Sequence, residues 1–131
     1  MVEIYIDGAS IGNPGKIGIG YLISKDKKLI KEESVYLGIG TNNFAEYMAL
    51  IFSLLETIAL DEKDCCVYSD SNLLCEQING TFRVKSKNIY PLFVLAKKLI
   101  SKLNSFSISH INREKNKEAD KLSKEATGFL I

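Results

Sequence analysis

Apolar and polar positions alternate at the start of the chain in a pattern that predicts three strands. The alternation over Val2–Ile6 is typical of a strand and places Asp7 at its end. We expect a second strand over Ile17–Ile23 and a third, edge-like strand over Leu29–Leu37. Because these strands follow one another directly, they predict an antiparallel meander.

The connection between the first two strands contains turn-forming residues. Asn13-Pro14-Gly15-Lys16 predicts a type II turn, since Pro14 presets φ at the second position and Gly15 accepts a positive φ at the third. Gly18 and Gly20 then interrupt the second strand. Glycines inside a strand indicate that another part of the chain approaches the backbone closely.

Apolar residues at helical spacing predict helices in the rest of the chain. The longest runs from Phe44 to about Leu60, with Thr41 or Asn42 as its N-cap, and places Glu46 beside its apolar stripe. The other predicted helices cover Ser71–Ile78, about Ile89–Leu103 and Glu118–Ala126, and the other strands cover Cys65–Ser69 and Phe106–His110.

This order of elements predicts a single α/β domain over residues 1–131. Strand-helix-strand units make neighbouring strands parallel, so we expect a five-stranded mixed sheet in which three antiparallel strands are followed by two parallel ones. Helices should flank both faces of this sheet.

Composition and charge narrow the class of protein. Hydrophobic residues make up 46% and charged residues 25% of the chain, as in ordinary globular proteins. The chain has neither an apolar run of about 18 residues nor a basic segment followed by an apolar core, so we expect a cytoplasmic protein. Its ordinary surface composition predicts a monomer. Cys65, Cys66 and Cys75 form no CxxC pair and are interpreted as core thiols rather than as disulfide or zinc ligands.

Four acidic residues occupy unusual positions. Asp7 and Asp70 each follow a predicted strand, whereas Glu46 and Asp120 lie on inward-leaning helix faces. Each one alone is typical of a surface residue or a cap. If the first and fourth strands are parallel neighbours, however, Asp7 and Asp70 emerge side by side and repel unless protonated or bridged by cations. Four converging carboxylates predict a site for Mg²⁺ or Mn²⁺, with two ions roughly 4 Å apart for in-line phosphoryl displacement.

Other phosphoryl chemistries fit the sequence less well. The chain contains one histidine, so paired-histidine catalysis with a 2′-hydroxyl nucleophile is excluded, and a water activated by metal is the expected nucleophile. The segment Gly12–Gly18 lacks the Gly-Lys-Ser/Thr ending of a phosphate loop and leads into a strand instead of a helix.

Five motifs, in order, resemble those of type 1 ribonuclease H across essentially the whole chain. They are Asp7-Gly-Ala-Ser, Gly12-Asn-Pro-Gly15, Thr41-Asn-Asn-Phe-Ala-Glu-Tyr47, Ser69-Asp-Ser71 and Asn112-Arg-Glu-Lys-Asn-Lys-Glu-Ala-Asp-Lys-Leu122. The resemblance implies the ribonuclease H fold and endonucleolytic cleavage of the RNA strand of RNA/DNA hybrids, leaving 5′-phosphate and 3′-hydroxyl ends. It also implies that the metal ligands are Asp7, Glu46, Asp70 and Asp120.

The resemblance further implies contacts with the nucleic acid. Thr41 matches a residue that holds a DNA-strand phosphate, and Ile39 stands where some relatives have an arginine, which weakens that pocket. Recognition of 2′-hydroxyls in a wide minor groove distinguishes RNA from DNA. The residues expected to contact 2′-hydroxyls or base edges are Gly12, Asn13, Asn42 and Asn43.

The segment from Arg83 to Lys102 carries six cations and no acid, which indicates either a solvated helix face or a stripe that contacts phosphates. Several bacterial relatives insert an extra basic helix here, but the segment 80–88 is too short for one. We expect Arg83, Lys85 and Lys87 to substitute for it in part.

Product release in the family involves a mobile histidine, for which the chain offers two candidates. His110 lies ten residues before Asp120, as in histidine-bearing relatives, while the segment that follows resembles a subgroup that uses a loop arginine, here Arg113. Either residue can also be read as purely structural: a packed strand residue or an exposed cation.

The leading hypothesis is therefore a Mg²⁺- or Mn²⁺-dependent ribonuclease H acting on RNA/DNA hybrids. A non-catalytic hybrid-binding domain is the alternative from another class. A third possibility keeps the chemistry but extends the substrate to double-stranded RNA or to single ribonucleotides embedded in DNA.

Overall fold

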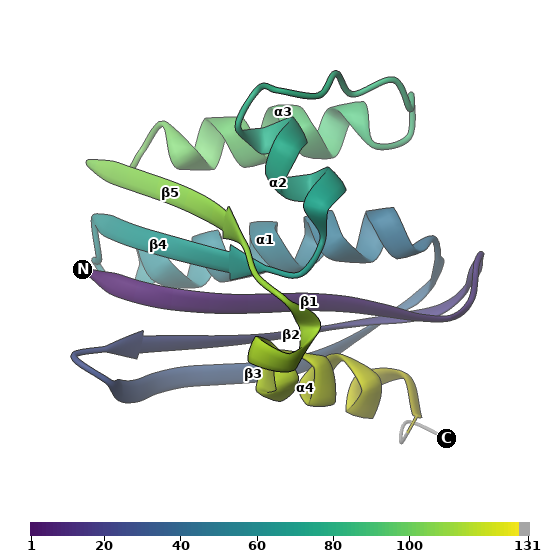
Figure 1. Ribbon diagram of the computed structural model, residues 1–131, viewed down its shortest axis with the longest axis horizontal. Helices are drawn as coiled ribbons and strands as arrows, with labels where there is room; N and C mark the ends of the chain where they lie inside the picture. The colour runs from purple at the N-terminus through teal and green to yellow at the C-terminus, as the bar shows by residue number, and fades with distance from the viewer. Residues whose placement is uncertain (129–131) are drawn as a thin grey trace.

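The strands of the computed structural model form one mixed sheet, as predicted (Figure 1). The structure describes residues 1–128; the last three residues of the predicted domain lie outside the described residues. Within residues 1–128 the five strands have the order β3-β2-β1-β4-β5, with antiparallel pairing among the first three and parallel pairing of β1 with β4 and β4 with β5. They are β1 (Val2–Gly12), β2 (Gly15–Lys25), β3 (Lys28–Gly40), β4 (Asp64–Ser69) and β5 (Ser105–His110).

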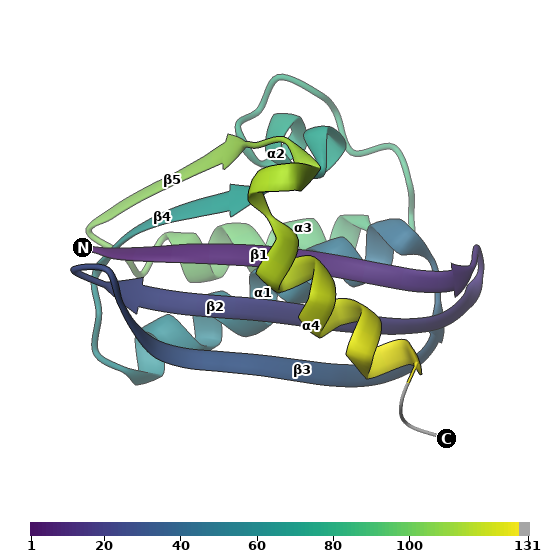
Figure 2. The same cartoon turned by 60° about the horizontal axis from the view of Figure 1, so that its bottom comes forward.

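Helices cover both faces of the sheet, which confirms the predicted layers. Figure 2 shows α4 crossing one face over β1 and β2, while α1 and α3 lie behind the sheet. No helix within residues 1–128 has both the length and the apolar character needed to cross a membrane. The helices are α1 (Asn42–Ala59), α2 (Asn72–Ile78), α3 (Tyr90–Ile100), α4 (Lys117–Gly128) and the short 3-10 helix η1 (Arg113–Lys115), which the sequence pattern did not predict.

The first hairpin differs from its prediction in two ways. Strand β1 does not end at Asp7 but continues to Gly12, because β2 pairs with it along its whole length, from Val2 with Lys25 to Gly12 with Gly15. The type II turn is also wrong. Gly15, the third residue of the predicted turn, does not have the positive φ that a type II turn needs there, and the positive φ falls on Gly12 instead. The Asn13–Pro14 peptide bond is cis.

The glycines of β2 allow α4 to pack directly on the sheet, as their placement predicted. A Cβ atom on Gly20 would lie 2.6 Å from the Ala119 oxygen and 2.6 Å from the Ser123 nitrogen. A Cβ atom on Gly18 would lie 2.5 Å from the Ala126 Cβ. Side chains at these two positions would push the helix away from β2.

The main core lies between the sheet and α1, and two of the cysteines belong to it. Cys65 and Cys75 are buried, and burial raises the pKa of these thiols to about 12 and about 11. Cys66 corrects the core-thiol interpretation, since it lies on the opposite face of β4, is partly exposed and contacts the Met1 sulfur at 3.3 Å. All three are free cysteines.

Candidate active site

Strand pairing brings Asp7 and Asp70 to the same edge of the parallel pair. The register of β1 with β4 ends where Ile6 faces Ser69, so the two acids are the next residues on their strands. Asp7 is 4% exposed in the middle of β1, and Asp70 begins the turn into α2. The predicted adjacency of Asp7 and Asp70 is correct. Only Asp70 follows the end of its strand, however, since Asp7 lies within β1.

Glu46 reaches the same place from the first turns of α1. The helix begins at the predicted cap, since the Thr41 hydroxyl accepts a hydrogen bond from the Phe44 amide. Glu46 is buried, and its Oε1 accepts a hydrogen bond from the Gly8 backbone amide. This contact requires α1 to lie against the backbone of β1.

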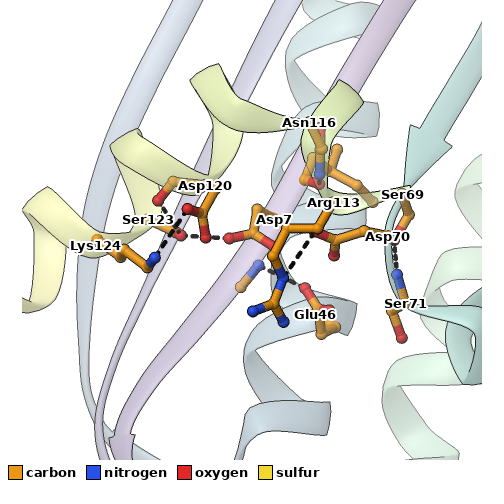
Figure 3. Close-up of polar contacts among 12 residues, drawn as sticks. Asp7, Glu46, Ser69, Asp70, Ser71, Arg113, Asn116, Asp120, Ser123 and Lys124 are labelled. Carbon is orange, nitrogen blue, oxygen red and sulfur yellow. Dashed lines mark hydrogen bonds and ion pairs between the residues drawn. The ribbon is translucent and has the colours of Figure 1, made fainter. Parts of the chain in front are cut away.

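The three acids form a compact cluster (Figure 3). One carboxylate oxygen each from Asp7, Glu46 and Asp70 lies within 4.8 Å of the others. Asp70 Oδ2 is buried and accepts no hydrogen bond from the described residues. A buried carboxylate oxygen without a hydrogen-bond donor is destabilising unless a cation or water satisfies it. The three carboxylates therefore fit as oxygen ligands of a hard divalent cation.

Burial and mutual repulsion oppose ionisation in this cluster. Burial, together with the charges of Asp70 and Asp120, raises the pKa of Asp7 to about 7, although a hydrogen bond from Ser123 opposes the rise. Burial and the charges of Asp7 and Asp70 raise the pKa of Glu46 well above its ordinary value. A bound cation would reverse this balance by favouring the ionised forms.

Asp120 lies beside the cluster and not within it. Among the described residues, the set within 4.8 Å comprises Asp7, Glu46 and Asp70. The Asp120 carboxylate instead pairs with Lys124 one turn later on α4, at 2.9 Å. The predicted convergence is therefore seen for three acids, whereas the fourth forms an ion pair within α4.

The two candidates for product release lie near the ends of β4 and β5. Arg113 Nε stands 4.0 Å from Asp70 Oδ2, and its side chain is 81% exposed. His110 is the last residue of β5, where it faces Ser69 in register and is exposed. Both therefore reach the edge of the sheet that carries the acids.

Two polar residues around the cluster were missed by sequence reasoning. Asn116 is 1% exposed, and its Nδ2 donates a 2.8 Å hydrogen bond to the Ile6 carbonyl, next to Asp7. Ser123 is fully buried and contacts Asp7 Oδ2. For Ser123 the available signal was its spacing from Asp120, since a residue three positions later shares its side of a helix. Asn116 lies before α4, so this signal does not extend to it.

Some of the residues predicted to contact nucleic acid lie close together. Asn13 in the hairpin turn accepts a hydrogen bond from the Asn42 amide at 3.0 Å, which joins the turn to the start of α1. A groove follows this junction toward the basic segment, but Gly12, Arg83 and Lys85 are not among its lining residues. The predicted residues that line it are Asn13, Thr41, Asn42, Asn43 and Lys87, and Ile39 lines it as well.

The sheet order and the acid cluster together define a ribonuclease H-like protein. A family model described as reverse transcriptase-like matches residues 6–126. The crystal structure of RNase H1 from the archaeon Halobacterium salinarum aligns with a TM-score of 0.92 at 35% identity, covering 95% of this chain and 96% of that one. The chain belongs to the type 1 ribonuclease H family.

Two further relatives are similar to the chain over most of its length. The structure of LC11-RNase H1 in complex with an RNA/DNA hybrid aligns with a TM-score of 0.92 at 34% identity, covering 97% of this chain and 96% of that one. A bifunctional protein of Mycobacterium tuberculosis is 34% identical over 127 residues, which are 95% of this chain. The chain spans 35% of the length of that relative.

Proposed function

We propose that the chain is a divalent-metal-dependent endonuclease that hydrolyses the RNA strand of RNA/DNA hybrids and leaves 5′-phosphate and 3′-hydroxyl ends. The observation that carries this proposal is the buried cluster of Asp7, Glu46 and Asp70 in a member of the type 1 ribonuclease H family. A solved relative with the same fold holds an RNA/DNA hybrid.

The proposed ligands for Mg²⁺ or Mn²⁺ are these three acids, with Asp120 as the fourth and two ions in the site. Such ions supply Lewis-acid activation and offset the charge that develops during phosphodiester hydrolysis. The protein itself orients the ligands. The Gly8 amide holds Glu46, and Asn116 ties the segment before α4 to β1 beside Asp7.

The groove at the junction of the hairpin turn with α1 is the proposed binding surface for the hybrid. Amide groups of Asn13, Asn42 and Asn43, with the backbone at Gly12, suit 2′-hydroxyls and minor-groove base edges, and Thr41 suits a phosphate. Arg83, Lys85 and Lys87 add positive charge along the neighbouring segment. Ile39 in the lining supplies no charge to a phosphate.

Arg113 is the preferred candidate for assisting product release, because its side chain is exposed and stands near Asp70. An exposed guanidinium can contact a departing phosphate and return to solvent. The same role for His110 stays a prediction. A cytoplasmic location and a monomeric state also stay predictions.

The test is cleavage of a labelled RNA/DNA hybrid by the purified chain with Mg²⁺, Mn²⁺ or EDTA, beside the Asp70→Asn variant. Full activity in EDTA or in Asp70→Asn would exclude the proposed mechanism. Hybrid binding without cleavage by the wild-type chain would instead favour a non-catalytic domain. Duplex RNA and a DNA duplex with one ribonucleotide, run in parallel, would determine whether the substrate range is wider.

A further inference from the structure

The Ser123 hydroxyl donates a hydrogen bond to the Asp7 carboxylate (Figure 3). Its Oγ lies 2.5 Å from Asp7 Oδ2 and 2.8 Å from the Asp120 backbone oxygen. A hydroxyl carries a single proton, so it donates to one of these oxygens at a time. The ionised carboxylate is the stronger acceptor of the two, because charge-assisted hydrogen bonds are shorter and stronger.

The local packing explains how a helix residue comes to touch this carboxylate. Asp7 on β1 faces Gly20 on β2, so the residue beside it in the sheet has no side chain. A Cβ atom on Gly20 would lie 2.6 Å from the Ser123 backbone nitrogen, and one on Gly18 would lie 2.9 Å from the Ser123 backbone oxygen. The two glycines therefore let α4 lie close enough for Ser123 to reach Asp7.

We propose that Ser123 is a positioning residue, whose hydroxyl holds the Asp7 carboxylate in the orientation that shares a divalent cation with Glu46 and Asp70. The carboxylate offers about four lone-pair sites, so one hydrogen bond leaves room for metal. Hydrogen-bonded partners of metal ligands typically contribute about 10- to 100-fold to affinity or activity. This inference rests on the proposed function, because it assumes that the acid cluster binds metal.

A serine inside a helix also has a simpler role, and the chain contains a matched example of it. Ser53 on α1 is equally buried, and its hydroxyl donates to the Leu50 carbonyl at 2.8 Å, three residues earlier. Ser123 has the same relation to Asp120. Ser53 therefore reproduces the helix contact of Ser123 without the acid and provides the control substitution.

The experiment measures Mn²⁺ binding without nucleic acid, by electron paramagnetic resonance of free Mn²⁺, for the wild-type chain, Ser123→Ala and Ser53→Ala. We expect Kd for Mn²⁺ to rise about tenfold in Ser123→Ala and to stay unchanged in Ser53→Ala. If Ser123→Ala does not fold, Ser123→Cys keeps most of the volume, replaces the hydroxyl by a weak donor and should raise Kd in the same direction. Wild-type affinity in the folded Ser123 variant would overturn the inference.

Hybrid cleavage by the wild-type chain separates this inference from the proposed function. Cleavage by the wild-type chain together with unchanged Mn²⁺ affinity in the Ser123 variant would overturn the inference alone. Weakened Mn²⁺ binding in the variant, in a chain that cleaves no hybrid, would support the inference and contradict the function. A wild-type chain that binds no Mn²⁺ would overturn both.

Discussion

The backbone amide of Gly8 donates a hydrogen bond to Glu46 Oε1, and the absence of a side chain at Gly8 makes this contact possible. A Cβ atom at this position would lie 2.5 Å from the Ala45 carbonyl carbon and 2.5 Å from the Glu46 nitrogen. Both are backbone atoms of α1, so rotation of a side chain cannot relieve the overlap. The position of Glu46 in the cluster therefore depends on a glycine on the neighbouring strand.

Gly8→Ala should consequently destabilise the protein and displace Glu46. We expect a loss of about 3 kcal/mol in the free energy of unfolding, at the upper end of the range for overpacked sites, and loss of hybrid cleavage. Urea unfolding measures the first effect. Gly128→Ala is the control, since no atom lies within 4 Å of the added Cβ there, and it should leave stability nearly unchanged. Equal stability of the two variants would contradict the close packing of α1 on β1.

Metal-free stability should fall as the pH rises through the acid cluster. Burial raises the pKa of Asp7 from its ordinary value of 3.8 to about 7, so between these values the folded chain holds a proton that the unfolded chain releases. The contribution of Asp7 is thus fully present below about pH 4 and is lost by about pH 7, at up to ~1.4 kcal/mol per pH unit. Urea titrations in EDTA from pH 4 to pH 8 measure this slope, and Asp7→Asn should flatten it. A slope that Asp7→Asn leaves unchanged would assign the effect to other groups.

Asp70→Asn should separate stability from activity. Removing its charge relieves repulsion of Asp7 and Glu46, so we expect the metal-free variant to be more stable than the wild type at pH 8 by roughly 1 kcal/mol. The same variant should lose hybrid cleavage. Glu114→Gln, which neutralises an exposed acid, should change neither property. A destabilised Asp70→Asn would show that repulsion within the cluster is not the dominant effect.

The sheet and the adjacency of Asp7 with Asp70 were predictable because they depend on strand order and on where β4 ends. The extent of β1 was not, since Gly8-Ala-Ser-Ile-Gly12 lacks a clear alternation and is held in the sheet by β2 along its whole length. The ion pair of Asp120 with Lys124 was also missed, although its i, i+4 spacing on a helix is one that favours such pairs.

The contact between Ser123 and Asp7 required information that no local pattern contains. It depends on the register that sets Asp7 opposite Gly20 and on the distance at which α4 packs over that glycine. The glycines of β2 did predict a close approach, but not which segment approaches. Sequence periodicity assigns residues to faces, whereas the partner across a face follows only from tertiary packing.

The basic segment should contribute to hybrid affinity mainly through phosphate contacts. Replacing Arg83, Lys85 and Lys87 by glutamine should weaken binding and reduce the slope of log Kd against log salt by about one for each lost contact. Fluorescence anisotropy with a labelled hybrid, in the Asp70→Asn background, measures the slope without cleavage. Lys63→Gln serves as the control, because it removes a cation just before β4, at the end of the strand opposite to Asp70. An unchanged slope in the triple variant would mean that these residues do not contact the hybrid.

The Tyr47 hydroxyl connects α1 to the same basic segment through a buried glutamine. It donates a 2.7 Å hydrogen bond to Gln77 Oε1, and Gln77 Nε2 donates to the Arg83 carbonyl at 3.4 Å. Tyr47→Phe leaves the buried amide oxygen without its donor, which costs about 1–3 kcal/mol. Because the amide then loses its fixed orientation, its hold on Arg83 weakens as well.

We therefore expect Tyr47→Phe to loosen the segment around Arg83 under native conditions. Trypsin cleaves after Arg83, Lys85 and Lys87, so the initial rate of proteolysis there reports the opening of the segment. Tyr21→Phe is the matched control, because the Tyr21 hydroxyl donates a 3.0 Å hydrogen bond to Glu56 on the other side of α1. Faster cleavage in Tyr47→Phe alone would show that Gln77 holds the segment locally. Equal cleavage in the two variants would mean that the loss of a buried hydroxyl acts only through global stability.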